Sequence, residues 1–108
     1  MSYKRNFYGG ILLDEEKLKQ NNIYHNIEVE YYKITNDKNT LFQGKTKTYG
    51  IEVIMKEHIN NNIITEKEKI EELTKNEHII EKVLNKLKEN EVTPTTLKDV
   101  IYDLFFLP

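Results

Sequence analysis

The fold of this 108-residue chain is decided by the stretch Tyr49-Gly50-Ile51-Glu52-Val53-Ile54-Met55-Lys56-Glu57-His58. Its apolar side chains recur at every second position, from Tyr49 through Ile51 and Val53 to Met55, and Ile54 is the one apolar residue out of step. This alternation is typical of an antiparallel strand with one buried face and one solvated face. We therefore predict a central strand over residues 49–58, with room for a pairing strand on each side.

A first strand is predicted over residues 25–35, because apolar and polar residues alternate in Ile27-Glu28-Val29-Glu30-Tyr31-Tyr32. The polar run that follows it, which begins Asn-Asp-Lys-Asn, predicts a turn or loop over residues 36–47. Within this loop we expect Leu41 and Phe42 to fold back onto the edge of the sheet.

The N-terminal residues carry the weakest pattern in the chain. Tyr8-Gly9-Gly10 predicts a turn or flexible joint, and residues 14–19 predict a short helix with Asp14 as its N-cap. We expect a partly ordered N-terminal segment over residues 1–24, followed by a single α+β domain over residues 25–108.

After the central strand, Asn60-Asn61-Asn62 predicts a hairpin turn, since asparagine tolerates the positive φ of a type I′ turn. The return strand would cover residues 63–72, with charged residues on both faces, as is typical of a protected edge strand. An alternative is open for this segment. Thr65 with Glu68 forms a capping-box pattern, so one helix could run over residues 66–90.

Two helices are predicted near the C-terminus. The first covers residues 75–90, and its apolar stripe recurs at spacings of three and four: Ile79, Ile80, Val83, Leu84 and Leu87. Thr93-Pro94 opens the second, whose inward face is Leu97, Val100, Ile101, Leu104 and Phe105. The predicted fold class is α+β: a three-stranded antiparallel sheet followed by two C-terminal helices packed on one face.

The composition excludes several functions. The chain has no cysteine, which excludes disulfides, thiolate metal sites and a cysteine nucleophile. Lys and Arg total 16 against 18 Asp and Glu, a net charge of −2, which argues against a nucleic-acid partner. No apolar run is long enough to span a bilayer, so we expect no membrane partner and a cytoplasmic location.

The polar motifs predict no catalytic residue, no cofactor and no metal site. His25 and His58 lie near one end of the predicted hairpin, but their register places them on opposite faces of the sheet. Gly44-Lys45-Thr46 lacks the upstream glycine of a phosphate-binding loop. The glutamates of residues 66–81 alternate with lysines, as on a solvated face, and serine occurs only at Ser2.

The aromatic residues give the best candidates for an interaction surface. Tyr32 follows Tyr31 directly, so the two side chains point to opposite faces of their strand, and one covered face cannot bury both. The C-terminal residues add further apolar side chains on more than one side of a helix end. The predicted surface consists of Tyr32, Tyr102, Phe106 and Leu107. We also predict a homodimer in which Phe106 and Tyr102 pack against a second copy.

A family resemblance supports this order of elements. The strand motif Tyr49-Gly50-Ile51-Glu52, and the V-T-P-x-x-L-x-D-V-I motif over residues 92–101, resemble those of short bacterial proteins, mostly from spore-forming firmicutes. These proteins share a domain of unknown function, and the resemblance covers residues 27–104. It implies the strand and helix order and supplies no site. Because the chain has no cysteine, a single serine and three scattered histidines, we expect a non-enzymatic protein-binding or regulatory module, for example an inhibitor of its partner; a small enzyme or ligand-binding domain is the alternative.

We expect Val53→Asp to prevent folding, because the substitution places an unpaired carboxylate in the middle of the predicted buried layer. Thermal unfolding followed by circular dichroism tests this expectation. A cooperative transition close to that of the wild type would show that the other face of residues 49–58 is the buried one.

Overall fold

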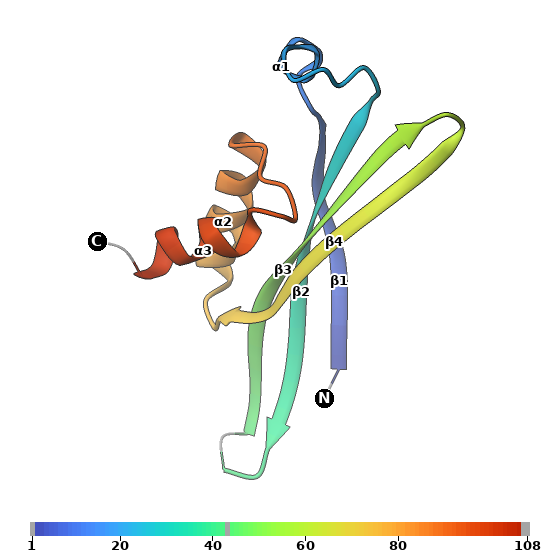
Figure 1. Cartoon of the computed structure of the whole chain (residues 1–108). Helices are drawn as coiled ribbons and strands as arrows, with labels where there is room; N and C mark the ends of the chain where they lie inside the picture. Colours follow the sequence, from blue (N-terminus) through green and yellow to red (C-terminus); the bar gives the residue numbers. More distant parts are fainter. Residues whose placement is uncertain (1, 43, 107–108) are drawn as a thin grey trace.

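The computed structural model describes residues 2–42 and 44–106. Its four strands form one antiparallel sheet in the order β1-β2-β3-β4, and two C-terminal helices lie against one face of that sheet (Figure 1). The elements in chain order are β1 (Ser2–Leu12), α1 (Glu15–Gln20), β2 (Ile27–Thr40), β3 (Gly44–Ile59), β4 (Asn62–Thr74), α2 (Glu77–Glu89) and α3 (Leu97–Phe106). The predicted α+β class, antiparallel sheet and central strand are confirmed.

The predicted count of three strands is wrong, because residues 2–12 pair with β2 as a fourth strand. Tyr8-Gly9-Gly10, which predicted a turn, lies within β1, where the register shifts between Phe7 and Gly9. This bulge accommodates one extra residue, and Gly9 gives room to the Lys88 side chain of α2, which would lie 3.2 Å from a Cβ there. The predicted boundary between an N-terminal segment (residues 1–24) and the α+β domain (residues 25–108) stays a prediction.

The short helix α1 is a third helix besides the two at the C-terminus. Asp14 is its N-cap, as predicted: the Oδ1 atom accepts hydrogen bonds from the backbone N–H groups of Glu16 at 2.8 Å and Lys17 at 3.3 Å. These bonds satisfy two of the donors that a helix start leaves unpaired.

The predicted loop over residues 36–47 is wrong, because β2 and β3 continue pairing from Asn36–Thr48 to Thr40–Gly44. Leu41 and Phe42 therefore sit at the end of a long hairpin. They do not fold back onto the sheet: Leu41 is 93% exposed and Phe42 is 95% exposed. These last strand pairs consist of polar residues and Gly44. Such residues can pair as strands because backbone hydrogen bonding does not require apolar side chains.

The second hairpin agrees with the prediction. Asn60 and Asn61 have φ values of 48° and 68°, the positive values that a type I′ turn needs at both central positions. The following residues form strand β4 rather than a helix, and β4 is an edge strand with Glu66-Lys67-Glu68-Lys69 in its middle. The two hairpins project from the sheet in opposite directions (Figure 1).

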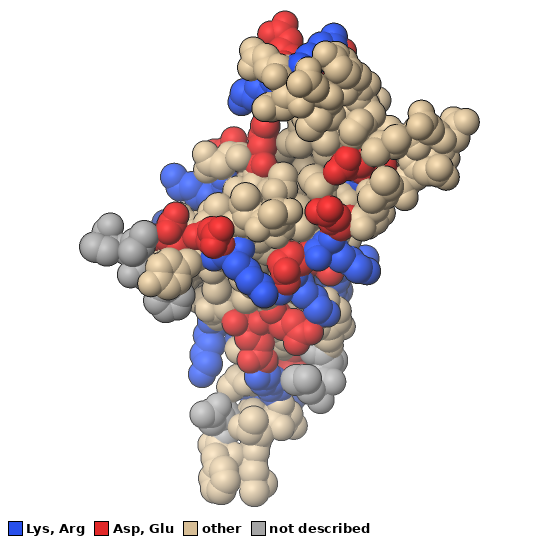
Figure 2. All heavy atoms as spheres, viewed as in Figure 1, with Lys and Arg blue, Asp and Glu red and all other residues tan. Residues whose placement is uncertain are grey.

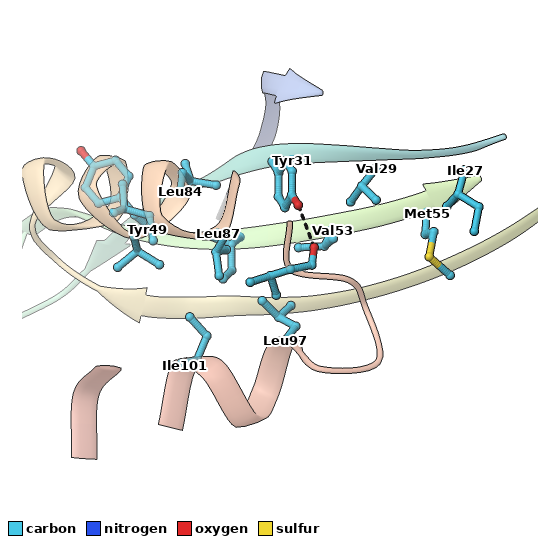
Figure 3. Close-up of a cluster of buried hydrophobic side chains, with 14 residues drawn as sticks. Ile27, Val29, Tyr31, Tyr49, Val53, Met55, Leu84, Leu87, Leu97 and Ile101 are labelled. Atoms are coloured by element: carbon cyan, nitrogen blue, oxygen red, sulfur yellow. Dashed lines mark hydrogen bonds between the residues drawn. The ribbon is translucent and has the colours of Figure 1, made fainter. Parts of the chain in front are cut away.

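One hydrophobic core lies between the sheet and the two C-terminal helices (Figure 3). Val29, Tyr31, Ile51 and Val53 supply its sheet side and are fully buried. The helical side includes Ile80, Leu84 and Leu87 of α2 and Leu97 and Ile101 of α3. Burial of each such side chain contributes about 1.5–3 kcal/mol. The buried phenol of Tyr31 also donates a hydrogen bond of 2.8 Å to the carbonyl of Val92, which joins the sheet to the α2–α3 connection.

The helix ends differ from the prediction in detail. The N-cap of α2 is Asn76, whose side chain accepts from the N–H groups of His78 and Ile79, while Thr74 accepts from the N–H of Asn76. Helix α3 begins at Leu97, since the residues from Thr93 form a turn first. Three residues assigned to inward faces are exposed instead: Ile79, Leu104 and Phe105.

We expect Tyr31→Phe to lower the free energy of unfolding by about 1–3 kcal/mol at pH 7, because it leaves the buried carbonyl of Val92 without its donor. Burial, with a further contribution from Glu91, raises the pKa of the folded Tyr31 phenol above its ordinary value. Above about pH 10 the unfolded phenol loses its proton while the folded phenol keeps it. The stabilisation is therefore present below that pH and is lost as the pH rises further.

The difference in stability between wild type and Tyr31→Phe should accordingly narrow between about pH 10 and pH 11. Urea unfolding of both proteins at pH 7, 10 and 11 measures it, and the other ionisable groups are common to both. A difference that stays constant over this range would contradict the buried, hydrogen-bonded phenol.

Candidate interaction surface on the open face of the sheet

The face of the sheet opposite the helices, here called the open face, carries one row of side chains from all four strands. The register aligns Phe7 with Tyr32, Tyr32 with Glu52, and Glu52 with Lys69. These residues alternate with the buried ones of the core, so they point away from the helices. In this row the aromatic side chains come from β1 and β2, and the charged side chains come from β3 and β4.

Strand β4 crosses over the open face at Gly50. The part of the open face toward the β2–β3 hairpin is called its lower part, and the part toward α1 its upper part, as they lie in Figure 1. Between the pairs Ile51–Ile70 and Tyr49–Thr74, β4 has three residues where β3 has only Gly50. A Cβ on Gly50 would lie 2.1 Å from the carbonyl oxygen of Ile70. The backbone of β4 therefore occupies the place of a side chain, and Figure 1 shows β4 passing across β3 and β2.

Further contacts fix this crossing. Asn36 of β2 donates a side-chain hydrogen bond of 2.8 Å to the carbonyl of Glu71, and Lys38 forms an ion pair with Glu72. Beneath the crossing, Ile34 is fully buried although it faces away from the helices. The lower part of the open face is thus closed by the chain itself.

The upper part carries a cluster of Arg5, Tyr32 and Phe7 around the buried carboxylate of Glu52. The Arg5 Nη1 atom lies 2.6 Å from Glu52 Oε1, and the Arg5 Cζ atom lies 4.4 Å from the centre of the Tyr32 ring. The Phe7 ring meets the Tyr32 ring edge-on, with 5.6 Å between centroids and an interplanar angle of 73°. Guanidinium stacking and edge-on ring contacts are both favourable geometries.

The cluster is exposed on one side. Phe7 is 61% exposed, and an open hollow of about 400 Å³ lies beside it, lined by Phe7, Gly10, Ile11, Leu12, Glu28, Val29 and Glu30. Tyr3 extends the cluster along β1, and the Nζ atom of Lys69 lies 5.4 Å from the centre of its ring. Since β1 and β4 are the two edge strands, this contact spans the open face from one edge of the sheet to the other. Tyr3, Arg5, Phe7 and Tyr32 are called the aromatic cluster below.

Electrostatics keep the two cations of this surface charged. The hydrogen bond with Glu52 raises the pKa of Arg5, and that with Glu71 raises the pKa of Lys69. Burial raises the pKa of the Tyr32 phenol, with an added contribution from Glu30, whose carboxylate accepts its hydrogen bond at 3.3 Å. At neutral pH the surface therefore presents a neutral phenol beside two permanent cations.

The structure separates the residues that the sequence proposed as one interaction surface. Tyr32 lies in the aromatic cluster, whereas Tyr102 belongs to α3, which packs on the other face of the sheet. Leu107 and the side chain of Phe106 lie outside the described residues, so the homodimer through Phe106 and Tyr102 stays a prediction.

Sequence reasoning missed Tyr3, Arg5 and Phe7 because it did not predict β1. The signal that could have found them is their spacing of two, which places all three on one face of a strand.

The two histidines lie on opposite faces, as their register predicted. His25 Nε2 lies 2.8 Å from Glu57 Oε2, and Glu57 pairs with the core residue Ile27. His58 Nε2 lies 2.9 Å from Glu28 Oε1 on the open face. Each histidine thus has one glutamate from the neighbouring strand as its partner. Over residues 2–42 and 44–106, no group of three or more His, Cys, Asp or Glu side chains has a metal-binding arrangement.

Two other sequence motifs that were considered as sites have only structural positions. Gly44-Lys45-Thr46 begins strand β3 rather than leading into a helix. Among the glutamates of residues 66–81, Glu77 and Glu81 bind Lys33 on the protein surface, at 3.1 and 3.5 Å. In the described part of the chain, no helix has the length and apolarity needed to cross a membrane.

The fold and this surface define a small α+β protein with a four-stranded meander, helices on one face and an aromatic, cation-bearing surface on the other. The chain belongs to the Family of unknown function (DUF6514), whose model matches residues 12–106. The resemblance seen in the sequence is confirmed as far as membership of a family of unknown function, and the match extends beyond the motifs that carried it. No curated protein and no solved structure matches the chain.

Proposed function

We propose that this protein is a non-enzymatic binding module that holds another protein against the open face of its sheet. The observation that carries this proposal is the aromatic cluster. The exposed ring of Phe7 packs edge-on against the ring of Tyr32, on which the guanidinium of Arg5 also stacks. These side chains lie on the sheet face that the helices leave uncovered. Such a surface offers a partner a large apolar contact next to directional cations.

The residue types and their rigidity support a binding role. Tyrosine, arginine and other aromatic residues are enriched among the residues that dominate binding energy at protein interfaces. In this cluster Glu52 fixes the guanidinium of Arg5, and Arg5 and Phe7 fix the ring of Tyr32. Side chains that are already ordered lose less conformational entropy on binding. The hollow beside Phe7 could receive an apolar side chain of the partner.

The sequence resemblance favours a bacterial source. The composition, without cysteine and without an apolar run long enough to span a bilayer, favours a cytoplasmic location. Neither identifies the partner. A module of this size acts by occupying a surface of its partner, so a regulatory role, such as inhibition, suits it better than a reaction of its own. The partner would contact β1, β2 and the adjoining part of β3.

Site-specific photo-crosslinking in the source cell tests the proposal. Phe7→p-benzoylphenylalanine should give a discrete adduct with one protein, identified by mass spectrometry, since the side chain would lie in the interface. The matched control is Tyr24→p-benzoylphenylalanine, because Tyr24 is 75% exposed in the loop after α1 and lies outside the aromatic cluster. It should not give that adduct.

Competition shows whether the adduct depends on the cluster. An excess of purified wild-type protein, or of the Tyr24→Ser variant, should suppress the adduct in a cell lysate. The double variant Tyr3→Ser/Phe7→Ser should not suppress it, while its circular dichroism spectrum stays that of the wild type because both residues are exposed. Equal suppression by all three proteins, or equal adducts from positions 7 and 24, would contradict the proposed surface.

A further inference from the structure

The end of the β2–β3 hairpin exposes two large apolar side chains, Leu41 and Phe42, that no described element covers. Leu41 and Phe42 are adjacent and more than nine-tenths exposed, at the tip of a hairpin that extends well beyond the helices (Figure 1). On the face seen in the space-filling view, the lower end of the molecule, where this hairpin ends, carries no Lys, Arg, Asp or Glu (Figure 2). Adjacent exposed apolar side chains form a contiguous apolar patch, and such patches are candidates for protein or membrane contacts.

Behind the tip the hairpin is basic. Residues 38–47 carry Lys38, Lys45 and Lys47 and no acidic residue, in a chain whose net charge is −2. Two of these lysines have an acidic neighbour outside the stretch: Lys38 pairs with Glu72, and Lys47 Nζ lies 3.8 Å from Asp37 Oδ1. Both pairs are at least partly exposed, so water and salt weaken them, and the local charge stays positive.

The other hairpin of the protein provides a contrast. Its end also carries apolar residues, Ile63 and Ile64, and both are exposed. Residues 57–66 contain Glu57 and Glu66 but neither lysine nor arginine. The two tips are therefore similar in apolarity and opposite in flanking charge.

The distance between the apolar side chains of the tip and the lysines behind them matches the distance between the acyl-chain boundary and the lipid phosphates of a membrane surface. A strand rises about 3.3 Å per residue, so Lys45 and Lys47, one and three residues behind the last hairpin pair Thr40–Gly44, lie roughly 3 and 10 Å behind that pair. Apolar groups of surface-bound segments enter about 5–10 Å into the boundary between headgroups and acyl chains. With Leu41 and Phe42 at that depth, the lysines would lie at the level of the lipid phosphates.

We propose that the β2–β3 hairpin tip binds the surface of an anionic lipid bilayer, with Leu41 and Phe42 inserted and the lysines against the phosphates. This contact is independent of the open face. It departs from the expectation of no membrane partner, which rested only on the lack of an apolar run long enough to span a bilayer. A bilayer suits two fully exposed side chains because it accepts them without a shaped pocket. The cytoplasmic leaflet, which is anionic, has the required charge.

A single tryptophan reports directly on the tip, because the chain contains no tryptophan of its own. The emission of Phe42→Trp should shift to shorter wavelength and intensify on addition of vesicles with about one third phosphatidylglycerol in phosphatidylcholine. Pure phosphatidylcholine vesicles should give a much smaller change, since the lysines then find no anionic partner. Ile64→Trp, at the acidic tip, is the matched control and should not shift with either vesicle.

Co-sedimentation with the same anionic vesicles measures the affinity of the native side chains. Leu41→Ser/Phe42→Ser should abolish sedimentation, and Ile63→Ser/Ile64→Ser should leave it unchanged. Lys45→Gln should weaken binding about fivefold, as loss of one cation near an anionic surface predicts, and added salt should reduce binding of the wild type.

Three results would overturn the proposal. One is no sedimentation of the wild type at low salt; another is equal binding to anionic and neutral vesicles; the third is an unchanged affinity for Leu41→Ser/Phe42→Ser. Circular dichroism confirms that each variant is folded.

Discussion

The structure depends on the close approach of the β4 backbone to Gly50. At this point the chain of β4 lies where a side chain of β3 would otherwise stand, and the contacts of Asn36 with Glu71 and of Lys38 with Glu72 follow from it. The crossing buries Ile34 and brings β4 round to begin α2. It therefore decides both how the helices reach the opposite face of the sheet and how much of the open face stays accessible.

This constraint gives the two faces of the sheet different roles. The helices bury one face in an ordinary hydrophobic core, and the phenol of Tyr31 joins that core to the α2–α3 connection. On the other face, β4 closes the lower part, and the pair of Arg5 with Glu52 organises the upper part without covering it. This pair holds the rings of Tyr32 and Phe7 in place at a solvent-accessible position, and ordered side chains lose less conformational entropy on binding.

Most of the fold could be predicted from periodicity, because alternation marks β2 and β3 and a stripe at helical spacing marks α2. Strand β1 could not, since its bulge and two glycines interrupt the alternation that starts at Tyr3. The candidate site was found only at Tyr32, because Arg5 and Phe7 reach it from that missed strand. The crossing at Gly50 depends on two extra residues in a charged strand, which no local pattern reveals.

Gly50→Ala tests the central claim most directly, with Gly10→Ala as its control. At Gly50 the added Cβ would lie 2.1 Å from a backbone carbonyl oxygen, whereas at Gly10 its nearest neighbour would be at an ordinary 3.4 Å. Thermal unfolding should show a midpoint at least about 10 °C below wild type for Gly50→Ala, because the backbone of β4 must move, and little change for Gly10→Ala. A Gly50→Ala midpoint within about 2 °C of wild type would contradict the crossing of β4 over the open face.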